Sequence, residues 1–228
     1  QKSLLQKYMP NATIIDMLGA SEGGPFGIAM TAPNEDPIAT AVFIAPPNAT
    51  TFNDETWEPL PRGSTVPGVL GVSGPMPQGY YRDEAKTAQT FREINGVRYT
   101  IPGDYALIDE QGVMQLLGRG SVCINTGGEK VFPEEVEEVL KRHASVRDAV
   151  AVGIPDTRFG ETICGVVEAE HDQVPTLAEL NEHVKKSLAA YKAPRHIVVI
   201  DTIGRAPNGK VDYKRLKAYA MKELGIAT

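Results

Sequence analysis

The sequence predicts an α+β protein in two parts, a β-rich first part over residues 1–119 and a smaller β/α part over residues 120–228. Prolines and turn signals concentrate between residues 25 and 80, where only short apolar runs fit between them, and this pattern favours short strands over helices. After residue 119, strand-like runs are interspersed with segments of helical periodicity. A chain of 228 residues is long enough for each part to bury a core of its own.

The first part is expected to consist of short strands joined by tight turns. The apolar runs TAVFIAP (40–46) and VLGVSGP (69–75) lie between turn signals. The Asn95-Gly96 pair predicts a β-hairpin, because both residues tolerate the positive φ angles of a two-residue turn. Residues 109–112 separate two alternating runs, so β structure is expected to continue to Arg119.

The second part is expected to begin with a hairpin about Gly127-Gly128, followed by a helix that has Pro133 at its first position. On this helix Val136, Val139, Leu140 and His143 recur at helical spacing. Further strands are expected at 146–154, 162–170 and 196–203, and further helices at 176–190, with a capping box of Thr176 and Glu179, and at 212–225, with Asp212 as its cap and Gly225 as its stop.

Composition narrows the class of protein. The net charge is −6, yet residues 185–228 carry 10 basic and 3 acidic side chains. This basic end could meet an anionic ligand such as a nucleotide, or it could be a solvated helix face, and the lack of interleaved aromatic residues argues against nucleic acid. No apolar run reaches the ~18 residues of a membrane span. We therefore expect a cytoplasmic protein without a transmembrane segment, in which Cys123 and Cys164 are reduced packing residues.

The loop GRAPNGKV (204–211) has the Gly-x4-Gly-Lys spacing of a phosphate-binding P-loop between a strand and a helix. Two residues argue against that function. Val211 cannot supply the hydroxyl that ligates magnesium, and Pro207 lacks a backbone N–H that would hold a phosphate. Taken alone, the loop is therefore expected to be a surface loop.

Four motifs in order resemble the adenylate-forming acyl-CoA synthetases, which are related to luciferases and to peptide-synthetase adenylation domains. They are GASEGG (19–24), YTIPGDYALIDEQG (99–112), GRGSVCINTGGEKVFPEEVE (118–137) and GRAPNGKVDYKRLK (204–217). Their amino-acid sequences are most similar to those of the fatty-acyl and steroid side-chain CoA ligases of actinobacteria. The resemblance covers nearly the whole chain.

The resemblance implies a reaction in two halves. A carboxylic acid attacks the α-phosphate of ATP in the presence of Mg²⁺, and coenzyme A then displaces AMP from the acyl adenylate. The family's Ser/Thr/Gly-rich phosphate loop is missing from these 228 residues. We therefore expect a C-terminal fragment of a longer enzyme: residues 1–119 would be the last subdomain of the large AMP-binding domain, and residues 120–228 the small mobile C-terminal domain. The fragment alone is expected to be inactive.

By similarity, the first part would supply the nucleotide contacts. Glu22 would ligate Mg²⁺ and Ser21 would contact the α-phosphate, whereas Leu18 replaces the aromatic residue that the family usually places near adenine. Asp104 would accept hydrogen bonds from the ribose hydroxyls. Arg119 would donate to ribose or phosphate from the domain boundary.

By similarity, the second part would supply the moving groups. Ser121 would be the hinge, where relatives carry Asp or Lys. Gly127 and Gly128 would let the pantetheine arm of coenzyme A pass, and Lys210 would bridge the substrate carboxylate and the α-phosphate.

Several alternatives remain open from the residues alone. The motifs around Glu22 and Asp104 and the Gly127-Gly128 turn also fit ordinary loops and turns. Lys192 and Arg195 could meet the coenzyme phosphates or serve structural roles, and the histidines 143, 171, 183 and 196 have no metal or triad spacing. An adenylation domain that loads a carrier protein and a small nucleotide- or partner-binding module are the competing functions. The acyl substrate and a homo-oligomeric state are not determined by the sequence.

Overall fold

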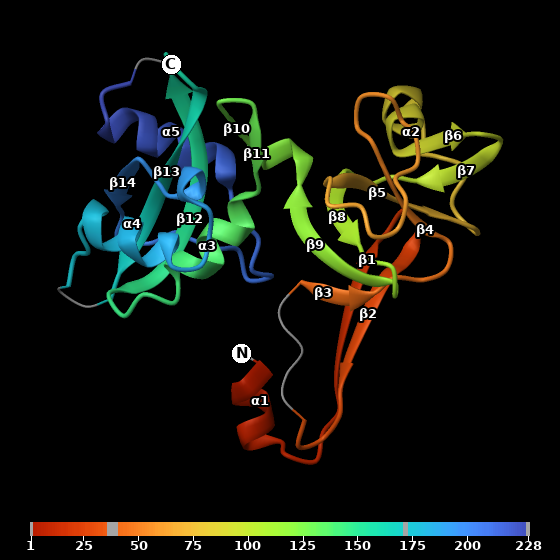
Figure 1. Ribbon diagram of the computed structural model, residues 1–228, viewed down its shortest axis with the longest axis horizontal. Helices are drawn as coiled ribbons and strands as arrows, with labels where there is room; N and C mark the ends of the chain where they lie inside the picture. The colour runs from red at the N-terminus through yellow and green to blue at the C-terminus, as the bar shows by residue number, and fades with distance from the viewer. Residues whose placement is uncertain (1, 36–40, 171–172, 227–228) are drawn as a thin grey trace. The chain divides into compact units, whose positions relative to one another are not determined.

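The computed structural model describes residues 2–35, 41–170 and 173–226 (Figure 1). The chain forms two compact units, residues 1–120 and 121–228, each described here by itself. The division lies one residue beyond the boundary expected between residues 119 and 120. Both units mix helices with mainly antiparallel strands, which confirms the predicted α+β class.

Unit 1 is built on an antiparallel sheet. The elements of unit 1 are α1 (Lys2–Tyr8), β1 (Ile14–Ala20), β2 (Gly24–Thr31), β3 (Val42–Ile44), β4 (Ala49–Phe52), β5 (Gly68–Ser73), α2 (Glu84–Thr90), β6 (Phe91–Ile94), β7 (Val97–Thr100), β8 (Asp104–Ile108) and β9 (Val113–Arg119). The strand order is β1-β2-β3-β9-β8-β5-β7-β6, and β4 pairs with β5. Of the expected strand at 40–46, Thr40 lies outside the described residues. The short strands and turns between residues 41 and 80 follow the prediction, whereas α1 and α2 were not predicted.

The hairpins of unit 1 follow from their turn residues. Asn95 and Gly96 have φ angles of 52° and 76° in the turn that joins β6 to β7. The Asp109 carboxylate accepts a hydrogen bond from the Val113 backbone N–H at 2.8 Å, which closes the turn between β8 and β9. Both predicted hairpins are confirmed. The β8–β9 register pairs Asp104 with Arg119, so two residues 15 positions apart in the sequence lie directly opposite each other.

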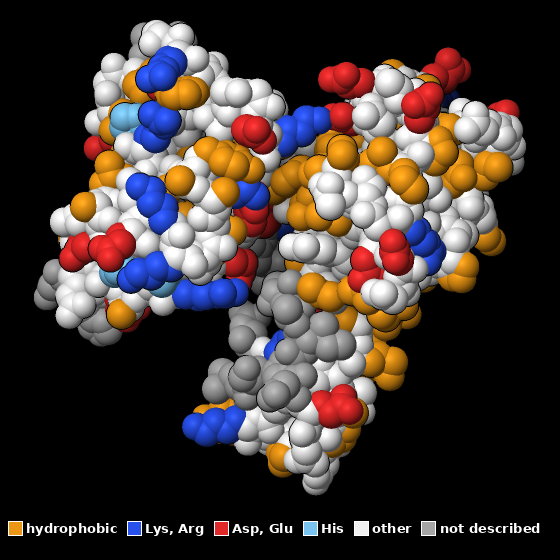
Figure 2. All heavy atoms as spheres, in the orientation of Figure 1, with side chains coloured by type: hydrophobic (Ala, Val, Ile, Leu, Met, Phe, Trp, Pro, Cys, Tyr) orange, Lys and Arg blue, Asp and Glu red, His pale blue; other side chains and the backbone are white. Residues whose placement is uncertain are grey.

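One face of β1, β2 and β3 is apolar and exposed. The register pairs Ile15 with Met30, Met17 with Ile28, and Ile28 with Ile44. All five side chains are between 40% and 65% exposed. Figure 2 shows hydrophobic side chains gathered along the part of unit 1 formed by β1 and β2. A contiguous apolar face of this kind is typical of a surface that packs against another element.

Unit 2 is a three-layer α/β arrangement. The elements of unit 2, with the short 3-10 turn η1 (Gly120–Val122) leading into them, are β10 (Ile124–Thr126), β11 (Glu129–Val131), α3 (Pro133–Leu140), β12 (Val146–Asp156), β13 (Gly160–Ala169), α4 (Leu177–Lys185), η2 (Ala190–Lys192), β14 (His196–Val199) and α5 (Tyr213–Glu223). The strand order is β11-β10-β13-β12, with β14 parallel to β13.

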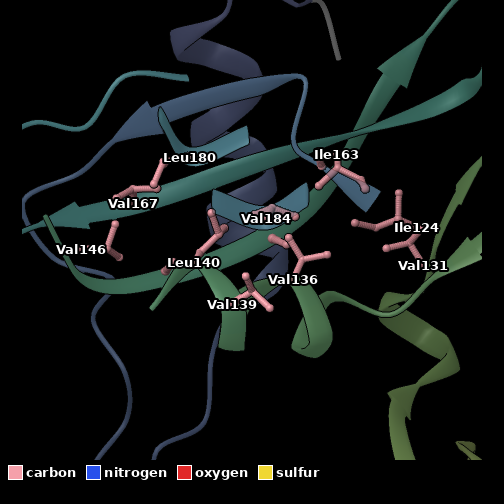
Figure 3. Close-up of a cluster of buried hydrophobic side chains, with 13 residues drawn as sticks. Ile124, Val131, Val136, Val139, Leu140, Val146, Ile163, Val167, Leu180 and Val184 are labelled. Atoms are coloured by element: carbon pink, nitrogen blue, oxygen red, sulfur yellow. The ribbon is translucent and has the colours of Figure 1, made fainter. Parts of the chain in front are cut away.

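Alternate residues of β12 and β13 face opposite layers. Ala149 and Ala151 of β12 belong to the cluster that packs against α3 and α4. Leu140 of α3 and Leu180 of α4 belong to the same cluster (Figure 3). The other face of the same strands packs against α5 through a second cluster that includes Val150, Val152, Ile154, Cys164, Val166, Leu216 and Ala220. Because both faces are buried, these strands read as continuous apolar runs. The core of unit 2 therefore fixes α5, and with it the loop that precedes this helix.

The three predicted helices and the five predicted strands of unit 2 are confirmed, with changes at their ends. The helix α3 ends at Leu140, so His143 lies beyond the helix on which its spacing had placed it. The strand expected over 196–203 ends at Val199. Asp212 accepts a hydrogen bond from the Arg215 N–H at 2.9 Å at the start of α5, and Gly225 has a φ of 66° at its end, as predicted.

Candidate functional site

Glu22 lies in the turn that joins β1 to β2. The Tyr80 hydroxyl donates a hydrogen bond to Glu22 Oε1 at 2.5 Å, and the Thr100 hydroxyl donates to the Glu22 carbonyl at 3.3 Å. The bond from Tyr80 holds the pKa of the Glu22 carboxyl below its ordinary value, and the positive charges of Lys86 and Arg119 act in the same direction. The turn thus presents an ionised carboxylate.

Asp104 and Arg119 form an ion pair across the start of β8 and the end of β9. The Arg119 Nε donates to Asp104 Oδ1 at 3.3 Å. Burial raises the pKa of the Asp104 carboxyl, and Arg119 partly offsets this effect. The Asp104 side chain is 16% exposed and that of Arg119 is 66% exposed. Gly103, which precedes Asp104, has a φ of 92°, a backbone conformation that suits glycine.

Glu22, Asp104 and Arg119 act on one another electrostatically, although they come from three separate segments. Arg119 lowers the pKa of both carboxyls, and the Glu22 charge raises the pKa of Asp104. This cluster is suited to Mg²⁺ held by a carboxylate together with substrate phosphates and water, which is the usual magnesium arrangement. Among the described residues no group of three or more Asp, Glu, His or Cys side chains could hold a metal by itself.

Ser21 borders a cavity of about 390 Å³ in unit 1. Gly23, Asn48 and Ser73 also line it, together with several prolines. Leu18, at the position where the family carries an aromatic residue, is partly buried against the core of the unit. Its side chain therefore serves packing in this unit.

The segment around Ser121 joins the two units. Gly120 donates its backbone N–H to the Gly103 carbonyl at 3.0 Å, and a Cβ at Gly120 would lie 2.6 Å from the Tyr105 ring. Ser121 is exposed and, with Cys123, borders a cavity of about 310 Å³ in unit 2. The packing of unit 1 therefore ends at Gly120, immediately before the expected hinge residue.

The Gly127-Gly128 turn joins β10 to β11. Both glycines are exposed, with φ angles of 61° and 89°. The Gly127 N–H donates to the Phe159 carbonyl at 2.9 Å, and the Arg195 guanidinium lies 4.1 Å from the centre of the Phe159 ring. The hairpin tip is thus bare of side chains, with an aromatic ring and a cation beside it. Lys192, by contrast, is held by Glu135 at 2.6 Å.

Lys210 lies in the exposed loop between β14 and α5. The loop uses its own backbone groups: the Ala206 N–H donates to the Lys210 carbonyl at 2.9 Å, and the Gly209 N–H donates to the Ala206 carbonyl at 2.7 Å. These N–H groups are not available to hold phosphate as in a P-loop, in agreement with the argument from Val211 and Pro207. Within the described residues no ion pair is formed by the Lys210 ammonium.

The remaining candidates that the structure describes are not brought together in a further metal-binding group. Cys123 and Cys164 are free thiols, and burial raises the pKa of the Cys164 thiol to about 12. The rings of His143 and His183 pack edge to face at 5.2 Å, while His171 lies outside the described residues. None of the described helices is long and apolar enough to cross a membrane.

Sequence reasoning missed Tyr80, Lys86, Glu137 and Tyr213. Tyr80 is 58 residues from Glu22 in the sequence, and the Lys86 ammonium lies 3.9 Å from the centre of its ring. Glu137, on α3, is only 3% exposed. Its burial could have been suspected from its position on the face of α3 adjacent to Val136 and Leu140.

Burial also raises the pKa of the Glu137 carboxyl, to about 7 from an ordinary 4.5. Between these pH values the folded chain binds more protons than the unfolded chain, so stability falls as pH rises through this window. In the unmodified chain, we expect the free energy of unfolding of unit 2 to fall by at most about 3 kcal/mol as pH rises through this window. Glu137→Gln has no carboxyl to titrate, so we expect the variant to lack this fall. Urea unfolding followed by NMR of the β12 amides, at pH 5 and pH 8, measures the free energy of unfolding of both chains. A difference between variant and unmodified chain that is the same at both pH values would show that the raised pKa is wrong.

Comparison with known proteins identifies the domain family that unit 2 matches. Residues 135–210 match the family model of the AMP-binding enzyme C-terminal domain. Unit 2 therefore carries an AMP-binding enzyme C-terminal domain, as the sequence motifs predict.

Relatives extend the similarity to unit 1. The chain is 46% identical, over 94% of its length, to a medium/long-chain-fatty-acid–CoA/3-oxocholest-4-en-26-oate–CoA ligase of Mycolicibacterium smegmatis, and covers 39% of that protein. It is 45% identical over 92% of its length to the 3-oxocholest-4-en-26-oate–CoA ligase of Rhodococcus rhodochrous, of which it covers 38%. The predicted resemblance to actinobacterial CoA ligases is thus confirmed, and the chain spans about two fifths of the length of these relatives.

A solved structure shares the fold. The ATP-bound MatB of Rhodopseudomonas palustris superposes with a TM-score of 0.77 at 29% identity, over 92% of this chain and 41% of that one. The similarity includes both units, since neither alone accounts for 92% of the chain.

Proposed function

We propose that this chain is the C-terminal part of an AMP-forming acyl-CoA ligase that acts on fatty acids or on the carboxylate of a steroid side chain. The observation that carries the proposal is the 46% identity over 94% of the chain to a ligase named for both kinds of substrate. The exposed apolar face of β1–β3 supports a larger enzyme, because the remaining three fifths of such a protein would have a surface to pack against. The chain alone would be inactive.

In the first half-reaction, the acid's carboxylate oxygen attacks the α-phosphate of ATP and pyrophosphate leaves. Both reactants are anionic, so the barrier falls when cations offset the developing charge. Glu22 would hold Mg²⁺, Ser21 would contact the α-phosphate, and Arg119 would donate to ribose or phosphate. Asp104 would accept from the ribose hydroxyls through Oδ2, since Oδ1 accepts from Arg119. Lys210 would bridge the two reacting anions.

In the second half-reaction, the thiol of coenzyme A attacks the acyl carbon and AMP leaves. Gly127 and Gly128 would let the pantetheine chain pass along the backbone, since neither has a side chain to block it. Arg195, which lies against Phe159 beside this turn, is better placed to meet a coenzyme phosphate than Lys192, whose ammonium is paired with Glu135. Ser121 would be the hinge about which unit 2 alternates between the two halves, and the reaction would take place in the cytoplasm.

The test is a product assay on the complete ligase that contains this chain. We expect AMP, pyrophosphate and acyl-CoA in equal amounts from ATP, coenzyme A and either a medium- or long-chain fatty acid or 3-oxocholest-4-en-26-oate. Short and aromatic acids serve as controls. Acyl adenylate and pyrophosphate without acyl-CoA, with AMP released only when a carrier protein is added, would instead favour the carrier-loading alternative. Absence of all products with every acid would contradict a ligase.

A further inference from the structure

The turn that carries Lys210 depends on its two flanks for its position. Its internal hydrogen bonds join Ala206, Asn208, Gly209 and Lys210 only to one another. Among the described residues, the hydrogen bond from Arg205 to the Gly209 carbonyl, at 3.4 Å, is the one that joins residues 206–210 to a residue outside the turn. The hydrogen bonds of Arg205 and Tyr213, together with the packing of Val211 against the core, therefore determine where the turn lies on unit 2.

The first flank is held by Asp148 of β12. Arg205 donates through Nε and Nη2 to the two carboxylate oxygens of Asp148, at 2.6 Å and 2.9 Å. The side chains are 30% and 19% exposed. Burial alone would raise the pKa of the Asp148 carboxyl, but the bonds from Arg205 outweigh it and hold the pKa below its ordinary value. A two-bond pair of this kind fixes orientation as well as distance.

The second flank is held by Glu137 of α3. The Tyr213 hydroxyl donates to Glu137 Oε1 at 3.0 Å, and the Ala151 N–H donates to the same oxygen at 3.1 Å. Tyr213 is the first residue of α5, three positions after Lys210. Because Glu137 is buried, removal of a donor from it changes a contact that water cannot readily replace.

We propose that Asp148 and Glu137 are positioning residues for adenylation, which hold Arg205 and Tyr213 so that the loop between them presents Lys210 to the substrate carboxylate and the α-phosphate. This inference rests on the function proposed above. A long lysine side chain offers one point charge, so its reach depends on where its backbone is anchored. A displacement of about 1 Å can cost a reaction up to about a hundredfold in rate.

The sharpest test is Tyr213→Phe in the complete ligase, with Tyr219→Phe as the matched control. Tyr219 lies on the same helix and donates its hydroxyl to the Val199 carbonyl at 2.9 Å, at the end of β14 and outside the turn that carries Lys210. We expect Tyr213→Phe to slow adenylate formation, measured by ATP–pyrophosphate exchange, by about tenfold. Thioester formation from a supplied acyl adenylate should change less than about twofold, and Tyr219→Phe should leave both rates unchanged.

The first flank is tested by Asp148→Asn, Arg205→Gln and the double variant. If the two side chains act through their shared bonds, the double variant should slow adenylation no more than either single variant does. Equal slowing of both half-reactions by Tyr213→Phe, or full adenylation in it, would overturn the inference.

Lys210→Ala shows whether the positioning role alone has failed or whether the role assigned to Lys210 has failed with it. If Lys210→Ala loses adenylation while Tyr213→Phe does not, the positioning role alone is wrong. If Lys210→Ala retains adenylation, the lysine's assignment and the positioning role fail together.

Discussion

Lys210→Ala in the complete ligase is expected to lower the rate of adenylate formation by about 10²- to 10³-fold, while thioester formation from a supplied acyl adenylate persists. The reason is that an ammonium between two anions stabilises charge that develops only when the carboxylate attacks the phosphate. The second half-reaction has a neutral or thiolate sulfur attacking an acyl carbon and needs no cation at that place. ATP–pyrophosphate exchange and single-turnover thioester formation measure the two halves separately.

Two further variants decide what Lys210 contributes. Lys222→Ala removes an equal charge from the exposed last turn of α5 and should leave both halves unchanged. Lys210→Arg keeps the charge but replaces a compact ammonium by a planar group, so partial recovery would separate charge from geometry. Equal loss of both halves in Lys210→Ala would contradict the assigned role.

The parts of the fold that could be predicted are those whose signals lie within a few residues. The turns at Asn95-Gly96 and Gly127-Gly128 have the positive φ angles that these residues favour. The capping box of α4 forms as predicted: the Thr176 N–H donates to Glu179 Oε2 at 2.8 Å, and the Glu179 N–H donates to Thr176 Oγ1 at 3.3 Å. The early end of β14 and the helix α2 were missed, since short apolar or polar runs do not distinguish their final structure.

The candidate site likewise contains residues that sequence motifs could name and residues that they could not. The resemblance named Glu22, Asp104, Arg119 and Lys210, and the β8–β9 register brings the second and third together. The groups that surround them could not be predicted. Tyr80 reaches Glu22 across 58 residues, and Tyr213 reaches Glu137 across 76, so each pair is created by packing and leaves no local pattern in the sequence. Only a structure brings such partners to attention.

Asp104→Ala is the second variant with a large expected effect, and it should weaken both half-reactions. Because the AMP moiety stays bound through adenylation and thioester formation, a ribose contact serves both. Loss of two hydrogen bonds to a carboxylate, each worth about 1.5–3 kcal/mol, should raise the KM for ATP by about a hundredfold or more. Steady-state kinetics at varied ATP measure this change. The expected result differs from that of Lys210→Ala, in which adenylate formation is slowed and thioester formation persists.

Asp109→Ala is the matched control, since Asp109 follows the other end of β8. Its carboxylate accepts from the Val113 N–H at 2.8 Å and is assigned no part in nucleotide binding. Asp109→Ala should therefore lower stability without a comparable rise in the KM for ATP. Asp104→Asn keeps one acceptor oxygen and the shape of the side chain, so its KM should lie between those of the unmodified enzyme and Asp104→Ala. A KM for ATP that Asp104→Ala leaves unchanged would mean that the Asp104–Arg119 pair is a structural clasp between β8 and β9 and that the ribose is bound elsewhere.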